Sequence, residues 1–274
     1  MKPKSKNLEQ QNWSIIFGVW LIYFCFGITV ASVAPLVPYI TNDLNISYKQ
    51  MGLILGAWQF TYIFFAIPAG YILDKYGLKA SIFMAAMIFT LSLISRGLSN
   101  NFYHMWLSVA LFGIGGPLIS VGAPKVSKLW KNQKYRSISM GILVTGPLFG
   151  GIISLSFINS IFMPLLNNDW QKVYLLYSFV PFISGCIWLI IFNRYKISYK
   201  KNTLNLNIKK SFMQFKLIIK KKRFLIILIL GTISMFLVHG IAGWLPKIIS
   251  SKGININLSS LFAIIPSFIG IIAA

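Results

Sequence analysis

Eight long runs of apolar residues constrain the fold of this chain more than any other feature of its sequence. The runs cover roughly residues 14–40, 50–73, 80–99, 104–124, 137–163, 173–193, 224–246 and 258–274. Each of the first seven reaches the roughly 20 residues that a helix needs to cross about 30 Å of hydrocarbon, and the eighth is still apolar at the last residue. Because backbone polar groups in lipid must be satisfied within the protein, the pattern predicts an all-α integral membrane protein.

The composition indicates the same environment. Hydrophobic residues make up 56% of the chain and charged residues only 11%, so a water-soluble domain could not cover its apolar surface. The net charge of +22 would suggest a nucleic-acid partner in a soluble protein. Here the basic residues lie between the apolar runs, where they indicate orientation and contact with lipid headgroups. We therefore expect a multi-pass protein of a plasma or inner membrane, with lipid and no nucleic acid as a partner.

The distribution of Lys and Arg predicts which side of the membrane each loop faces. If the N-terminus lies inside the cell, 21 of the 26 Lys and Arg residues fall on inner segments. The five on outer segments are Lys49, Arg96, Lys172, Lys247 and Lys252. Because short inner loops carry an excess of basic residues, the N-terminus is predicted to be cytoplasmic.

The runs and loops divide the chain into four parts. Residues 1–13 form a polar cytoplasmic N-terminus, 14–193 a unit of six spans, 194–223 a basic cytoplasmic loop, and 224–274 the start of a second unit. The loop has apolar residues near helical spacing, at Ile208, Phe212, Phe215 and Ile219. Two interpretations stay open: an amphipathic stretch on the inner membrane surface, or a solvated linker.

A short charged turn, Gly70–Lys79, separates the second and third runs. Its glycines, Gly70 and Gly77, permit positive φ and close backbone approach. Asp74 is one of only four acidic residues in the chain, and it is expected to cap the following helix. The basic residues Lys75 and Lys79 are expected to face lipid phosphates.

This turn resembles the loop signature of the major facilitator superfamily. Matches fall at Gly70, Asp74, Gly77, Lys79 and Ile82, and departures at Ile72, Leu73, Lys75 and Leu78. The resemblance implies a major facilitator-like helical bundle, in which the turn latches two six-helix halves on the inner side. Lys in place of Arg at position 75 loses bidentate pairing and implies a looser latch. The alternative is an ordinary capped turn that obeys the positive-inside rule.

Glycine and proline are dense in the fourth and fifth runs. Gly146, Pro147, Gly150 and Gly151 resemble the family's fifth-span motif, often seen in exchangers, although generic small-residue packing explains them nearly as well. Val109 occupies the position where some members carry a fourth-span Arg, which argues against the usual proton coupling.

Polar and aromatic residues inside the spans are candidates for a central cavity. They are Tyr23, Thr29, Trp58, Gln59, Tyr62, Thr145 and His239. All four acidic residues fall in loops or span ends, so His239 is named as the remaining ionisable candidate. For each, helix packing is the competing explanation, and for His239 a neutral ring bonded to a backbone carbonyl.

The resemblance implies secondary active transport of a small solute by alternating access. An organic or inorganic anion fits the positive inner charge and the general likeness of the fourth and fifth spans to anion and cyanate porters. Because family members normally have twelve spans, the chain is expected to lack at least the last four. The first alternative is therefore a truncated, non-transporting membrane protein or an interaction subunit. A membrane-embedded transferase is a weaker alternative, because no cluster of carboxylates or histidines is present. No catalytic, cofactor or metal motif is found, so no enzyme is expected.

Overall fold

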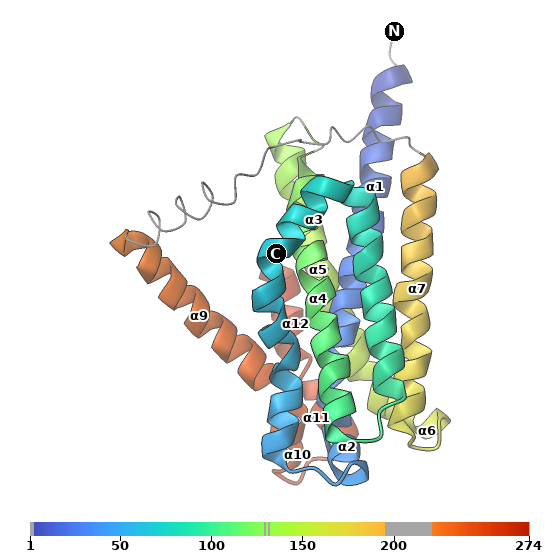
Figure 1. The fold of residues 1–274 in the computed structure, drawn as a ribbon, viewed down its shortest axis with the longest axis vertical. Helices are drawn as coiled ribbons and strands as arrows, with labels where there is room; N and C mark the ends of the chain where they lie inside the picture. The colour runs from blue at the N-terminus through green and yellow to red at the C-terminus, as the bar shows by residue number, and fades with distance from the viewer. Residues whose placement is uncertain (1–2, 129, 131, 195–220, 274) are drawn as a thin grey trace.

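The computed structural model describes residues 3–128, 130, 132–194 and 221–273, and all regular structure in those ranges is helical (Figure 1). The first group of elements, here called the α1–α7 bundle, consists of α1 (Pro3–Ala31), η1 (Ala34–Leu36), α2 (Val37–Asp43), α3 (Tyr48–Gly97), α4 (Phe102–Ser127), α5 (Gln133–Phe157), η2 (Ile158–Phe162), α6 (Met163–Leu165) and α7 (Trp170–Arg194). The second group, the α9–α12 segment, consists of α9 (Lys222–Ala242), α10 (Leu245–Ser250), α11 (Ile256–Phe262) and α12 (Ile265–Ala273).

The predicted membrane spans are confirmed as helices. Within the described residues, six helical segments are long and apolar enough to cross a membrane. They are Trp13–Asp43, Tyr48–Gly97, Phe102–Ser127, Gln133–Leu165, Trp170–Arg194 and Phe224–Ala242. The second segment contains both the second and the third apolar run, so the first seven runs are all accounted for. The eighth run forms two short helices, α11 and α12, which meet at a turn around Ala263.

Helix α3 holds two spans because the chain reverses direction within it. Gly77 has φ 78° and ψ 171°, a non-helical conformation that only glycine adopts readily. In Figure 1 the chain rises along the first part of α3 and descends along the second. The glycine expected at a tight turn is therefore required at Gly77. Gly70 has helical backbone and no close neighbour, so the expectation of a special conformation there is wrong.

Side-chain caps explain where three of the long helices begin. Ser47 and Gln50 form a capping box at the start of α3, with reciprocal side-chain and backbone hydrogen bonds. Asn101 accepts from the His104 amide before α4, and Asn132 accepts from the Lys134 amide before α5. These caps satisfy amide groups that the helix leaves without partners at its first turn.

The α1–α7 bundle packs around a core in which α1 contacts α5 and α7, and α3 contacts α4 and α7. Small residues allow close approach. A Cβ at Gly113 on α4 would overlap the Trp58 carbonyl of α3, and the nearby Thr61 hydroxyl donates to the Ala110 carbonyl at 2.6 Å. The bundle therefore holds its helices at backbone contact.

The α9–α12 segment is attached to one end of the bundle. Helices α10, α11 and α12 contact η1, η2 and α5. Helix α9 leaves this end at an angle, and in Figure 1 only its C-terminal part approaches the bundle. Most of the predicted inter-unit loop, including its four apolar positions, lies outside the described residues.

Candidate solute-binding cavity

A cavity of about 630 Å³ lies between the α1–α7 bundle and the α9–α12 segment. Its volume falls in the range typical of small-molecule sites. Helices α1, α3, α4 and α5 form one side, and residues of α9, α10 and α12 form the other. Most of the wall is apolar or aromatic, as at Phe26, Val30 and Leu55.

Four of the seven predicted cavity residues line this space: Thr29, Trp58, Gln59 and His239. The half-buried His239 ring makes an edge contact with Trp58, with ring centroids 5.3 Å apart, so α9 and α3 meet in the cavity wall. Gln59 Oε1 is buried without a hydrogen-bond partner in the described part of the chain. The Thr29 hydroxyl donates to the Cys25 carbonyl at 2.7 Å, a bond within its own helix.

Of the other three predicted residues, Tyr62 and Thr145 join neighbouring helices, and Tyr23 packs within its own helix α1. The Tyr62 hydroxyl lies 2.5 Å from Ser120 Oγ and joins α3 to α4. Trp20 Nε1 donates to Thr145 Oγ1 at 3.0 Å and joins α1 to α5. The Tyr23 ring packs edge-on against Phe26. None of Tyr23, Tyr62 and Thr145 lines the described cavity.

Arg96 also lines the cavity, although it was not among the residues predicted to do so. It was counted among the outer loop residues, but its side chain is only 1% exposed. Nη1 donates to the Thr29 carbonyl at 2.8 Å. Thr29 lies near the middle of the Trp13–Asp43 span, so the guanidinium reaches about the mid-depth of that span. Arg96 falls inside the predicted third run, and treating it as an intramembrane ionisable residue would have identified it.

Among the described side chains, those in contact with Arg96 include aromatic rings and no acid. The guanidinium carbon lies 5.8 Å from the Phe112 ring centroid and 5.7 Å from that of Tyr174. Arg96 Nε is buried and has no hydrogen-bond partner among the described residues. Val109, the position of the fourth-span Arg in some families, lines the same cavity. The cavity wall thus takes its permanent positive charge from α3 rather than from α4.

The fifth-span motif has two faces. A Cβ at Gly150 would lie 2.7 Å from the Ile28 amide nitrogen and closer still to the Phe24 carbonyl, and one at Gly146 would lie 3.0 Å from the Trp20 carbonyl. These two glycines therefore allow α5 to touch the backbone of α1. The neighbouring positions, Pro147 and Gly151, line the cavity.

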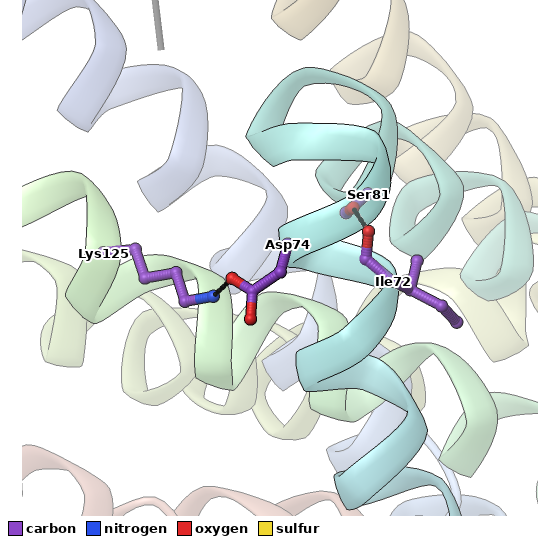
Figure 2. A network of polar contacts seen from close by, with 4 residues as sticks. All are labelled: Ile72, Asp74, Ser81 and Lys125. Carbon is purple, nitrogen blue, oxygen red and sulfur yellow. Dashed lines mark hydrogen bonds and ion pairs between the residues drawn. The ribbon is translucent and has the colours of Figure 1, made fainter. Parts of the chain in front are cut away.

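The turn around Gly77 is tied to other parts of the same bundle. Asp74 Oδ1 pairs with Lys125 Nζ of α4 at 2.6 Å, as Figure 2 shows, and both side chains are about a quarter exposed. Lys79 Nζ donates to Asn193 Oδ1 of α7 at 2.6 Å. Asp74 sits within helical backbone, so its expected role as a helix cap is wrong. Lys75 lies over the rings of Tyr71 and Tyr76.

The opposite end of the bundle contacts the α9–α12 segment. Asn159, in the π-helical turn η2, donates to Ser260 Oγ of α11 at 2.9 Å and to the Pro35 carbonyl at 3.2 Å. Lys247 of α10 lies over the Tyr48 ring at 5.5 Å. These contacts join the bundle to the α9–α12 segment at the end remote from Gly77.

Comparison with known proteins decides the family. A family model described as Major Facilitator Superfamily matches residues 19–274. The chain belongs to the Major Facilitator Superfamily. The family and its curated relatives are membrane transporters rather than enzymes. This result confirms the resemblance carried by the Gly70–Lys79 turn.

Curated relatives are similar over part of their length. The chain is 27% identical over 151 residues to a hexuronate transporter of Bacillus subtilis, covering 55% of this chain and 35% of the relative. It is 23% identical over 176 residues to a galacturonate transporter of Dickeya chrysanthemi, covering 64% and 50%. A 4-hydroxybenzoate transporter of Pseudomonas aeruginosa is 24% identical, with coverage of 66% and 40%. The chain thus spans between a third and half of the length of these relatives.

Solved structures of transporters share the fold. The chain superposes on a bacterial homologue of the lysosomal transporter Spinster, in an inward-facing and unoccupied conformation, with a TM-score of 0.73 and 16% identity. That match covers 98% of this chain and 61% of the other. A D-xylose–proton symporter matches with a TM-score of 0.71 and 16% identity, covering 94% and 66%. At these identities the likeness concerns the fold.

Proposed function

We propose that the protein takes part in secondary active transport of a small organic anion by alternating access. The main observation that supports this proposal is the cavity between the α1–α7 bundle and the α9–α12 segment. Transporters of this type hold the solute at the interface between two units near the middle of the membrane and expose it to each side in turn. A cavity whose wall comes from both units supports the first of these properties, a solute site at the interface.

The contacts at the two ends of the molecule support a state that is closed at one end and open at the other. A hydrogen bond and a cation–π contact join the bundle to the segment at the Asn159 end, through Ser260 and Lys247. At the Gly77 end, the ionic and amide contacts of the turn stay within the bundle. This arrangement corresponds to a state closed at the Asn159 end. We further propose that the Gly77 end and the N-terminus face the cytoplasm, because 21 of 26 basic residues lie on that side.

An anion is supported by the charge of the wall. Arg96 is buried in it, and no Asp or Glu is among the lining residues. The solutes named for the relatives agree, since hexuronate, galacturonate and 4-hydroxybenzoate are all carboxylates.

The test is uptake by proteoliposomes that contain the purified protein. Labelled galacturonate and 4-hydroxybenzoate are supplied outside, with and without the same unlabelled acid inside. We expect saturable uptake of the labelled acid, and faster uptake when unlabelled acid is present inside. Faster uptake is expected because a single site that faces each side in turn exchanges internal acid for external acid. Binding without flux would contradict transport by this protein and favour an interaction subunit.

A further inference from the structure

We propose that Arg96 is the anchor of the solute, and that it selects a small organic acid with a single carboxylate on an apolar or aromatic body. This inference rests on the proposed function, since it names the solute class of the same cavity. Three features carry it: the isolation of the charge, the unused donor, and the character of the wall around it.

The first feature is a buried positive charge without a counterion. Arg96 is 1% exposed. The structure describes the side chains of three acidic residues, and each is engaged elsewhere. Asp43 accepts from Trp170, Asp74 pairs with Lys125, and Asp169 pairs with Lys172. An uncompensated charge inside a membrane protein is costly and is typically retained for function.

The second feature is a hydrogen-bond donor left free. A guanidinium carries five N–H donors in a fixed planar fork. Nη1 is used on the Thr29 carbonyl, while Nε has no partner in the described part of the chain. A carboxylate needs two parallel donors from such a fork, and it supplies the missing negative charge as well.

The Thr29 carbonyl does not itself require Arg96. It also accepts from the Ser32 hydroxyl at 3.0 Å. Removing the guanidinium therefore leaves this carbonyl with a partner. Because the guanidinium also packs over the Phe112 and Tyr174 rings, ligand affinity rather than stability distinguishes a binding role of Arg96 from a structural one in the test below.

The third feature is the wall that the rest of a solute would meet. The cavity that Arg96 lines is also lined by Phe26, Trp58, Val30 and Leu55, with few polar side chains. Such a wall favours an apolar or aromatic body through burial of apolar area. The single positive charge of Arg96 balances the single negative charge of one carboxylate. The cavity lining therefore suits a monocarboxylate better than a dicarboxylate or a phosphate.

The experiment measures binding, so it does not depend on transport. The purified protein is dialysed against a panel of labelled acids, each matched with its uncharged alcohol: 4-hydroxybenzoate with 4-hydroxybenzyl alcohol, and galacturonate with galactose. Phthalate serves as a dicarboxylate. The wild-type protein is expected to bind 4-hydroxybenzoate at least about 10-fold more tightly than its alcohol, because the charged pair is lost in the alcohol.

The decisive variant is Arg96→Met, which removes the charge and keeps an apolar side chain of adequate length. Its affinity for 4-hydroxybenzoate is expected to fall by about 10- to 100-fold, to that of the alcohol, while its affinity for the alcohol is unchanged. The thermal midpoint without ligand is expected to stay level or rise, because replacing a buried charge with an apolar group is often neutral or stabilising. A lower midpoint with unchanged carboxylate affinity would overturn the proposal.

Arg136→Met is the matched control. Arg136 also has a buried Nε without a described partner and one bond to a backbone carbonyl, that of Trp130, but it does not line the cavity. Its affinities are expected to equal those of the wild type. If Arg96→Met does not fold, Arg96→Lys is the deciding variant. Lysine keeps the positive charge but lacks the planar fork of donors, so affinity is expected to fall partially for the acids and to stay unchanged for their uncharged partners. Equal affinity of Arg96→Lys and wild type for every acid would then overturn the proposal.

The inference and the proposed function fail separately. Arg96-dependent binding of acids without any flux would leave the anchor intact and contradict transport. Flux of a neutral solute that is insensitive to Arg96→Met would leave transport intact and contradict the anchor. A wild-type protein that prefers no acid of the panel over its uncharged partner also contradicts it.

Discussion

Helix α5 packs against two neighbours in different ways. Toward α1 it makes backbone contact, since a Cβ at Gly150 would lie 2.7 Å from the Ile28 nitrogen. Toward α12 the contacts are ordinary, since a Cβ at Gly151 would lie 3.9 Å from Ser267 Oγ and one at Gly270 would lie 3.4 Å from a Leu148 methyl group. The α1–α7 bundle is therefore tight, and its interface with the α9–α12 segment is loose.

The difference indicates which surface can move. Close-packed interfaces tolerate little change without a loss of stability. A loosely packed interface beside a cavity can open by rigid-body rotation of one unit against the other. In the proposed mechanism, the bundle is the body that holds Arg96, and the segment is the part that rearranges around the solute.

The largest expected effect comes from adding a methyl group on the tight face of α5. Gly150→Ala should destabilise the bundle by about 3 kcal/mol or prevent folding, because the Cβ meets backbone atoms of α1 that cannot move aside alone. Gly151→Ala, one residue on, should change stability by less than about 0.5 kcal/mol. Thermal unfolding in detergent measures both. Equal losses of stability in the two variants would contradict the difference between a tight and a loose face of α5.

A smaller effect is expected at the reversal of α3. Gly77→Ala forces a Cβ onto a residue with φ 78° and ψ 171° and should cost about 2 kcal/mol. Gly70→Ala is the control, because Gly70 has helical backbone with open space around it and should be neutral or slightly stabilising. The same unfolding measurement applies. If Gly77→Ala is as stable as Gly70→Ala, the reversal of α3 does not require a glycine at position 77.

The smallest effect on stability is expected at the Asp74–Lys125 pair. Asp74→Asn should cost only about 1 kcal/mol, because both side chains are partly exposed. Solute flux should fall several-fold with normal membrane insertion, if the turn is the latch that the family resemblance implies. The double exchange Asp74→Lys with Lys125→Asp should recover part of the flux. Wild-type flux in Asp74→Asn would contradict a latch role for this pair.

The sequence predicted the fold well because membrane spans depend on local hydrophobicity. The first seven apolar runs are helices in the structure, and the turn at Gly77 lies where a glycine was expected. The side-chain contacts were harder to predict, because they depend on which helix faces which. Asp74 was expected to cap the following helix but pairs with Lys125, 51 residues away in sequence.

The cavity was predicted in part for the same reason. Trp58 and His239 were recognised as unusual residues inside spans, and they meet in the wall. Tyr62 and Thr145 carry the same polar chemistry but face neighbouring helices, and residue type alone does not distinguish the two situations. Arg96 was missed because its charge near a span end was attributed to the loop, whereas its long side chain reaches back to Thr29.

The central claim is that the α9–α12 segment moves against the α1–α7 bundle during transport, and a disulfide across their contact tests it most directly. Asn159 and Ser260 share a hydrogen bond of 2.9 Å across this contact. The variant Asn159→Cys with Ser260→Cys is made after Cys25 and Cys186 are replaced by Ser, and uptake is measured before oxidation, after oxidation and after reduction. We expect the oxidised protein to lose nearly all flux while still binding solute, and reduction to restore the flux. Full flux through the cross-linked protein would contradict the account.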